Sequence, residues 1–249
     1  MEQLNERRPL VISFYKRERE GKGQISLRAY HLNKPISLSA RVPMLEHLGF
    51  RVINERSYRI TPADRELSYL HDTTLHLDED RFRNFTEADI ERLGALFLAV
   101  WNMQAENDGY NALALSAGLA WRDIAMIRAL SRYLRQAGIL YSEDYMWGTL
   151  NRYPQIAQQL VHLFHTRFDP TLGTFERSGK ESRLIDEISA SLEDVTSLDD
   201  DRILRRFQNL ILATLRTNFF QLDDAGQPKA TFAFKLDPHK VEGLPKPVP

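Results

Sequence analysis

The sequence predicts an α+β protein, with an antiparallel sheet and helices at the N-terminus followed by a mainly α-helical domain. Three observations support this fold class. β-branched, aromatic and alternating runs fall before residue 80. Apolar residues at helical spacing dominate from Thr86 to about Gln221. The elements before Thr86 follow the order strand, strand, helix, strand, strand, which suits a sheet covered on one face by helices, as in ferredoxin-like modules.

The first four predicted strands form two pairs around one helix. Leu10–Tyr15 and residues 24–30 are strands joined by a charged, glycine-containing turn. Residues 37–48 carry apolar side chains at helical spacing, and Gly49 suits the left-handed position that ends a helix. Pro43 lies inside this segment, so we expect the regular helix to begin near it. Residues 50–60, with one irregularity, and residues 69–77 are the remaining strands.

Helical periodicity accounts for most of the chain after Thr86, which is suited to cap a helix. The predicted helices that follow cover residues 110–117, 121–137, 142–153, 156–168 and 180–195. Thr171 to Gly179 contains two glycines and is predicted as an internal loop that is cleaved early in limited proteolysis.

The segment 197–221 is predicted as the helix around which the second half packs. Asp199 is the expected N-cap, and the carboxylates of residues 199–201 suit the positive end of the helix dipole. The expected buried face consists of Leu204, Phe207, Ile211 and Leu215. From these segments we predict an α+β module over residues 1–82, a helical domain over 83–222 and an extended tail over 223–249.

Composition excludes several classes of function. The 249 residues include 33 Lys and Arg against 34 Asp and Glu, a net charge of −1, so no overall basic charge favours nucleic acid. The chain has no cysteine, which excludes disulfides and thiolate chemistry and fits a reducing compartment. No apolar run approaches the ~18 residues of a membrane span, and no signal peptide is present. We expect a cytoplasmic protein that binds neither nucleic acid nor membrane.

Motifs for nucleotide binding and serine hydrolysis are absent from the sequence. His162 with His165, and His71 with Asp72 and His76, have metal-like spacings, but no third ligand is evident, so a structural role is favoured. Residues 106–109 lack the spacing of a calcium loop and are interpreted as a turn. We therefore assign no catalytic, cofactor-binding or metal-binding residue.

Arginines on the predicted helices allow two interpretations. They form solvated faces paired with nearby carboxylates, or they form a surface that docks on a partner. The residues chosen as a docking surface are Arg202, Arg206 and Arg216, which lie off the apolar face of the 197–221 helix.

Several long segments resemble one family, the very large bacterial NAD-specific glutamate dehydrogenases. Residues 45–55 (LEHLGFRVINE) are similar to a recurring "LExLGFRVxxE" segment of that family. Residues 105–111 and 117–122 (AENDGYN and AGLAWR), 133–136 (YLRQ), 199–221 and 234–238 (FKLDP) are similar to further family segments in the same order. The resemblance extends over nearly the whole chain from about Leu10.

The resemblance implies a place in the family's architecture. Residues 1–82 would be the last of several ACT-like regulatory modules, and the helices a connecting domain. The catalytic core, with its lysine, aspartate and Rossmann unit for NAD, would begin after the tail. The parent reaction would convert L-glutamate, NAD and water to 2-oxoglutarate, ammonia and NADH. This segment would itself be inactive, with a regulatory and architectural role.

The resemblance also implies partners: the protein's own downstream catalytic domain, further copies in a homo-oligomer, and an amino-acid effector. The alternative is a stand-alone module that senses an amino acid without catalysis. The reading frame separates the two, because only the first requires a dehydrogenase core after Pro249.

Overall fold

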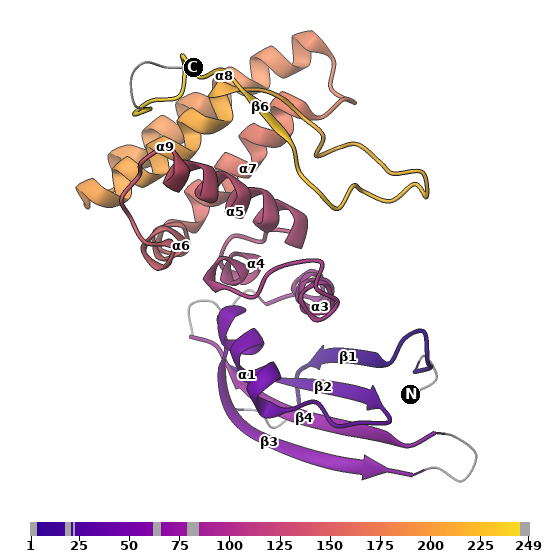
Figure 1. The fold of residues 1–249 in the computed structure, drawn as a ribbon. Helices are drawn as coiled ribbons and strands as arrows, with labels where there is room; N and C mark the ends of the chain where they lie inside the picture. Colours follow the sequence, from indigo (N-terminus) through magenta and orange to yellow (C-terminus); the bar gives the residue numbers. More distant parts are fainter. Residues whose placement is uncertain (1–3, 18–20, 22, 62–65, 79–84, 245–249) are drawn as a thin grey trace. The chain divides into compact units, whose positions relative to one another are not determined.

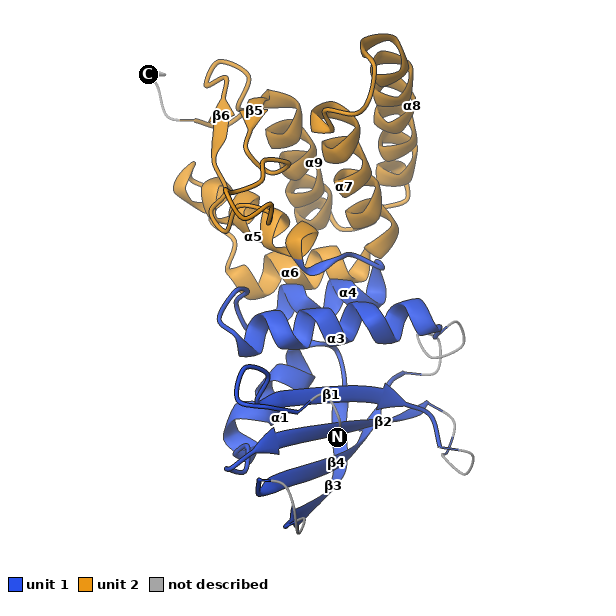
Figure 2. Ribbon diagram, turned by 90° about the vertical axis from the view of Figure 1, so that its right-hand side faces the viewer, with its two compact units in different colours: residues 1–121 blue, residues 122–249 orange. Residues whose placement is uncertain are grey.

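The computed structural model describes residues 4–17, 21, 23–61, 66–78 and 85–244. The chain divides into two compact units, residues 1–121 and 122–249 (Figure 2). The first unit extends past the boundary expected at residue 82, because helix α3 (Glu87–Trp101) packs against the sheet. The ring of Trp101 meets His31 of the sheet edge to face, with centroids 5.7 Å apart.

Unit 1 contains an antiparallel sheet with strand order β1-β2-β4-β3. The predicted strands are confirmed to within two residues. The irregularity expected in the third strand is a register shift between Val52 and Asn54. The strands are β1 (Leu10–Tyr15), β2 (Gln24–Leu32), β3 (Arg51–Ile60) and β4 (Ser68–His76).

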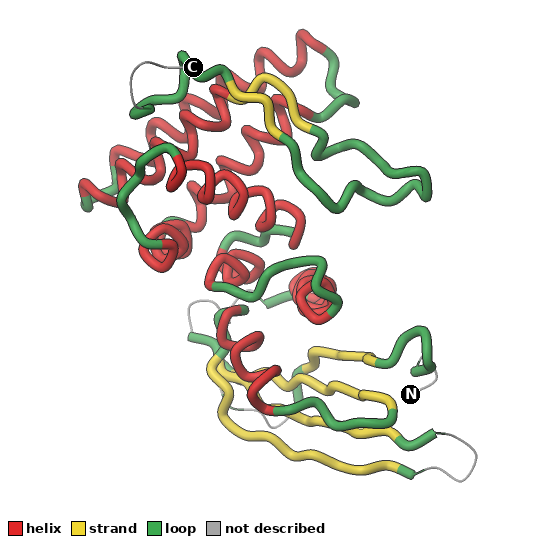
Figure 3. Tube along the Cα trace, in the orientation of Figure 1, coloured by secondary structure: helices red, strands yellow, loops and turns green. Residues whose placement is uncertain are grey.

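Helices α1 (Leu38–His47) and α3 lie on the same side of this sheet (Figures 1 and 3). Ile25, Leu27 and Leu75 are completely buried on the covered face. Helix α1 begins earlier than expected and contains Pro43 in its interior.

The end of α1 is set by Gly49, which has a φ of 92° that favours glycine. The N–H groups of Gly49 and Phe50 donate to the carbonyls of Glu46 and Leu45. These bonds satisfy carbonyls that the helix end leaves free.

The start of α3 is fixed as the sequence predicts. The Thr86 side chain accepts from the Asp89 N–H, and Asp89 accepts from the Thr86 N–H at 2.7 Å. Burial acts to raise the pKa of Asp89, but hydrogen bonds from Thr86 and the charge of Arg92 lower it overall. After α3, Asp108 Oδ1 accepts from the Tyr110 N–H and caps η1 (Gly109–Ala112), so the 106–109 segment acts as a turn that leads into α4 (Leu113–Ser116).

Unit 2 consists mainly of helices. Membrane spans are absent among the helices of the described segments, none of which is both long and apolar enough. The helices are α5 (Trp121–Gln136, whose first residue is counted with unit 1), α6 (Glu143–Arg152), α7 (Pro154–Phe168), α8 (Thr174–Glu193) and α9 (Leu198–Ala213).

The prediction of a loop from Thr171 to Gly179 is wrong for most of these residues, because α8 begins at Thr174 and includes Gly179. The Arg177 side chain binds the short segment before the helix, because its Nη2 donates to the carbonyls of Asp169 and Leu172 at 2.8 and 3.0 Å. These contacts stabilise the first turns of α8 although a glycine inside a helix costs about 0.5–1 kcal/mol relative to alanine.

Helix α9 has the predicted core but different ends. Leu204, Phe207 and Ile211 are completely buried, and burial of each contributes roughly 1.5–3 kcal/mol. Ser197, not Asp199, is the N-cap, and its hydroxyl accepts from the Asp200 N–H. The helix ends at Ala213, so the prediction that Leu215 is buried is wrong: it is 49% exposed.

Long-range contacts explain why α9 ends early. Arg167 Nη2 donates to the Leu212 carbonyl at 3.1 Å, and the Asp237 N–H donates to the Ala213 carbonyl at 2.8 Å, so the end of the helix has partners. The chain continues as β5 (Thr214–Thr217), which pairs antiparallel with β6 (Phe234–Leu236). The expected tail over 223–249 therefore includes a strand that returns to the helical unit.

Candidate functional site

The structure does not place the predicted docking arginines on one helical face. Arg202 and Arg206 lie on α9, whereas Arg216 lies on β5 beyond its end. Arg202 Nη1 is 3.8 Å from Asp199 Oδ1, and Arg206 Nη1 is 3.2 Å from Glu242 Oε2. Arg206 thus joins α9 to the segment after β6, within unit 2. A docking role for these arginines stays a prediction.

One histidine from each predicted group, His165 and His71, has a hydrogen-bond partner in the fold. His165 Nε2 donates to Asp123 Oδ1 at 2.7 Å, joining α7 to α5, while His162 is exposed. His71 is buried in the sheet of unit 1. Within the described parts of the chain, no three histidine or acidic side chains are grouped to hold a metal ion.

A cluster of side chains in unit 2 surrounds Arg122, in the first turn of α5. Its Nη1 donates to the Lys229 carbonyl and its Nη2 to the Phe219 carbonyl, each at 3.1 Å. The guanidinium carbon lies 5.1 Å from the ring centroids of both Phe219 and Phe232. Desolvation by burial lowers the pKa of Arg122. One cation therefore holds both sides of the segment that connects β5 to β6.

An aromatic cluster extends this contact to α7. Phe164, which is completely buried, meets Phe219 and Phe234 at centroid distances of 5.3 and 6.2 Å. His165 meets Phe219 and Phe220 edge to face. We call these aromatic residues, together with Arg122 and Asp123, the hairpin seat. It contains Arg122, Asp123, Phe164, His165, Phe219, Phe220, Phe232 and Phe234.

Sequence reasoning missed the hairpin seat because its halves are about 100 positions apart along the chain. The available signal was the density of phenylalanines in residues 219–234, a stretch that the sequence analysis divides between the end of the 197–221 helix and the tail. Rings of that kind seldom stay in solvent, so they required a partner on the helices.

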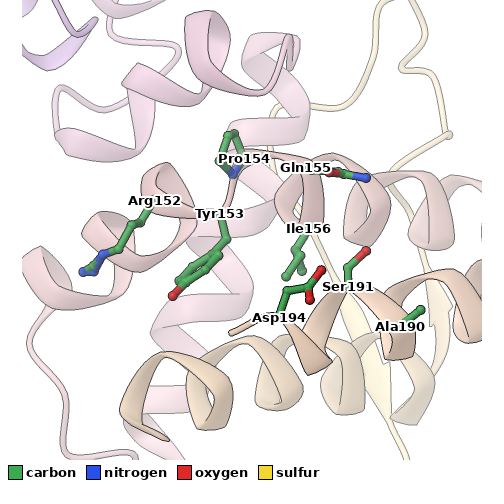
Figure 4. Close-up of a pocket in the computed structure, with 8 residues that line it drawn as sticks. All are labelled: Arg152, Tyr153, Pro154, Gln155, Ile156, Ala190, Ser191 and Asp194. Carbon is green, nitrogen blue, oxygen red and sulfur yellow. The ribbon is translucent and has the colours of Figure 1, made fainter. Parts of the chain in front are cut away.

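A pocket of about 440 Å³ opens between the α6–α7 junction and the end of α8 (Figure 4). Arg152 points away from the other lining side chains, and its Nη1 is 3.3 Å from the buried Asp200, which also accepts from Thr149. The lining lacks a nucleophile and base in contact, so we assign no chemistry to it. The pocket is lined by Arg152, Tyr153, Pro154, Gln155, Ile156, Ala190, Ser191 and Asp194.

Unit 1 contains a buried polar network between α1 and the sheet. Arg41 is 1% exposed, and its Nη2 donates to both Glu55 carboxylate oxygens at 2.7 and 2.8 Å. His71 Nε2 accepts from the Ile36 N–H, so its proton is on Nδ1, which donates to the Ser57 hydroxyl at 2.7 Å. The Ser57 hydroxyl donates to Glu55 in turn. Burial, with the nearby charge of Arg41, lowers the pKa of His71.

Three family models match successive parts of the chain. The glutamate dehydrogenase ACT3 domain matches residues 9–92, and glutamate dehydrogenase helical motif 3 matches residues 105–170. The bacterial NAD-glutamate dehydrogenase catalytic domain matches residues 187–249. The order is the one that the sequence resemblance implies.

Relatives match nearly all of the chain. The NAD-specific glutamate dehydrogenase of Halomonas elongata is 42% identical over 99% of it, and that of Pseudomonas aeruginosa is 40% identical over 99%. The protein of the same name from Mycobacterium tuberculosis is 32% identical over 93%. The sequence belongs to the NAD-specific glutamate dehydrogenase family. It spans 15% of the length of each of these relatives.

The glutamate dehydrogenase family models divide unit 2 in an informative way. The catalytic-domain match begins at residue 187, inside α8, earlier than the start expected beyond the tail. Helix α9 and both strands of the hairpin belong to this match, whereas α5 and α7 belong to the helical-motif match. The hairpin seat therefore joins two stretches that the glutamate dehydrogenase models treat as separate.

Proposed function

We propose that this chain is an architectural and regulatory segment of an NAD-dependent glutamate dehydrogenase. The parent reaction converts L-glutamate, NAD and water to 2-oxoglutarate, ammonia and NADH. The observation that carries the proposal is the hairpin seat: Arg122, on a helix of the helical-motif stretch, holds the hairpin of the catalytic-domain stretch. In this role the helices fix the position of the first strands of the catalytic region.

The energetics of a small hairpin favour such a role. An isolated two-stranded hairpin is marginally stable in water, so β5 and β6 require support from elsewhere. A hydrogen bond from a charged donor contributes about 1.5–3 kcal/mol, and a cation over an aromatic ring about 0.5–2 kcal/mol. Arg122 makes two of each. These contacts are strong enough to decide whether the hairpin is ordered.

The described residues of this chain do not fit an NAD site of the Rossmann type. A dinucleotide site of the Rossmann type needs parallel strands with a glycine-rich turn that leads into a helix. The strand pairs of the described ranges, in both sheets, are antiparallel. We therefore propose that NAD binds outside the described residues, and we derive no chemical step from this chain.

The regulatory part of the proposal concerns unit 1. Its match to an ACT3 domain supports a role in sensing, for which an amino acid is the effector that we propose. The partners that we propose are the protein's own catalytic domain and further copies of the same protein. The absence of cysteine fits a reducing compartment such as the cytoplasm.

The test uses the protein encoded by the complete reading frame, in which we expect a dehydrogenase core. Arg122→Ala should lower glutamate-dependent NADH formation about tenfold, the effect of roughly 1.4 kcal/mol. Arg183→Ala is the matched control, because Arg183 is an exposed arginine of α8. The 249-residue chain alone should form no NADH.

Two outcomes would contradict the proposal. If Arg122→Ala leaves activity unchanged while the variant is folded, the seat does not support the catalytic region. If the reading frame contains no dehydrogenase core, the alternative of a stand-alone amino-acid-sensing module replaces the proposal.

A further inference from the structure

The sheet of unit 1 has one face that its helices do not cover. Figures 1 and 2 show α1 and α3 on one side of the sheet. Ile25, Leu27 and Leu75, which are completely buried, mark that side. Residues paired across antiparallel strands point to the same face, so the registers define the residues of the other face. We call that other side the open face.

An apolar row crosses all four strands of the open face. The registers pair Val11 with Tyr30, Tyr30 with Leu70, and Leu70 with Tyr58. Each of these side chains is partly or largely exposed, and Tyr58 on the edge strand β3 is 46% exposed. Contiguous exposed apolar side chains with a polar rim are typical of protein interaction sites.

The next row on the same face is cationic. Arg28 is paired with Asp72, and Asp72 with Arg56, so two exposed arginines flank one carboxylate. Arg17 Nη2 adds a third cation at 2.6 Å from Asp72 Oδ1, and Arg28 lies 4.2 Å from the Tyr15 ring centroid. A partner for this face needs carboxylates opposite the arginines and apolar side chains opposite the tyrosine row. Two open faces would repel each other, because both are cationic.

Unit 2 presents a surface with these properties where α8 meets α9. Glu193 and Asp194 are exposed at the end of α8, and Asp199 is exposed at the start of α9. Leu198 between them is 64% exposed. The Tyr141 hydroxyl donates to Asp199 at 2.6 Å, which brings the 98% exposed Leu140 to the same place. We call this surface, formed by Leu140, Glu193, Asp194, Leu198 and Asp199, the acidic corner.

We propose that the open face binds the acidic corner of a second copy of this chain. The arginine row faces Glu193 and Asp194, while the tyrosine row covers the exposed leucines. Two different surfaces meet, so the contact is heterologous and leads to rings or larger assemblies rather than only to a two-fold dimer. The inference goes further than the association with other copies proposed above, because it names the two surfaces that meet, and it holds with or without a catalytic core.

The test measures the mass of the 249-residue chain by sedimentation velocity over a wide range of protein concentration. At low salt the average mass should rise with concentration. At high salt it should approach the monomer, because the Debye length falls to ~3 Å at 1 M. Arg28→Glu/Arg56→Glu should weaken association about tenfold or more. The variant places carboxylates opposite the carboxylates of the acidic corner, and like charges that face each other across an interface disfavour binding. Lys34→Glu/Arg183→Glu is the control with the same change in charge, at exposed positions outside both surfaces.

A charge exchange identifies the partner surface. Glu193→Arg/Asp194→Arg places cations at the end of α8, which the helix dipole tolerates. This variant alone and Arg28→Glu/Arg56→Glu alone should both stay monomeric, whereas their mixture should associate. Circular dichroism confirms that each variant is folded.

The proposal is overturned by any of four results: a monomer at all concentrations, association that persists in the arginine variant, a mixture that stays monomeric, or a salt effect that is independent of concentration. The last result would mean that the two surfaces do not join separate copies. Activity of a complete enzyme does not enter this test, so its outcome is distinguishable from that of the proposed function.

Discussion

The two units use opposite means to fix a helix in place. In unit 2, α9 is held by apolar side chains, of which Leu204, Phe207 and Ile211 are completely buried. In unit 1, α1 is held partly by a buried cation, Arg41, whose carboxylate partner Glu55 lies on β3. From this difference we expect the stability of unit 2 to depend on the volume and packing of its core. The stability of unit 1 should depend also on the protonation of a buried network.

The buried network is costly to disturb because two guanidinium nitrogens of Arg41, Nε and Nη1, lack partners among the described residues. The ion pair with Glu55 therefore provides most of the compensation for burying this charge. His71 connects the same network to the residue before α1 through the Ile36 N–H. We therefore expect the stability of α1 to depend on the charge state of the network.

The largest expected effect is in the apolar core of unit 2. Phe207→Ala should lower the free energy of unfolding by about 3–5 kcal/mol, since it removes a completely buried ring. Chemical denaturation followed by circular dichroism measures the change. A loss below about 1 kcal/mol would show that α9 is not the centre of the core.

Removal of the buried cation tests unit 1 in the same way. Arg41→Ala should cost about 3 kcal/mol, because it leaves the Glu55 carboxylate without its partner in a mostly buried site. The double variant Arg41→Met/Glu55→Leu should recover most of that loss, since an apolar pair needs no compensation. Equal stabilities of the single and double variants would mean that volume, not charge, matters at this position.

The dependence on pH should separate the units further. The pKa of His71 is lower in the folded state than its ordinary value of about 6.5, because burial and then Arg41 disfavour the charged ring. As the pH falls, His71 therefore takes up a proton at a higher pH in the unfolded chain than in the folded protein. Unit 1 should lose stability as the pH falls below about 6.5. A protonated Nε2 would also be unable to accept the hydrogen bond from the Ile36 N–H.

Hydrogen exchange measured between pH 7 and 5 checks this prediction by comparing peptides of α1 with peptides of α9. Faster opening at the lower pH is expected for α1 in the wild type, and a smaller change in His71→Asn, which has no titratable ring. If the acid effect is the same in that variant, another group is responsible.

The smallest effects are expected for the arginines that were predicted to dock. Arg202→Ala and Arg216→Ala should each change unfolding by about 0.5 kcal/mol or less, since both side chains are exposed. Arg206→Ala should cost up to about 1 kcal/mol, because the Glu242 pair is partly exposed. Losses as large as that of Phe207→Ala would make these arginines internal structural pairs.

Local signals in the sequence predicted the strands, most helix starts and the apolar face of α9, because each depends on residues close together. The end of α9 could not be predicted in this way, since Arg167 and the strand that returns from residue 234 determine it. Arg41 lay in a predicted helix, but nothing nearby indicated its burial, because Glu55 lies on a different element. The hairpin seat was missed for the same reason, as Arg122 and Phe219 meet only in the folded chain.

The most direct test of the hairpin seat is hydrogen exchange of residues 214–236 in Arg122→Ala, with Arg183→Ala as the control. Arg122 holds the carbonyls of Phe219 and Lys229, so its loss should release the segment between β5 and β6. We predict faster exchange throughout the hairpin, with α9 and unit 1 unchanged and the control like the wild type. Unchanged exchange in the hairpin of Arg122→Ala would contradict the claim that the helical unit holds the start of the catalytic region.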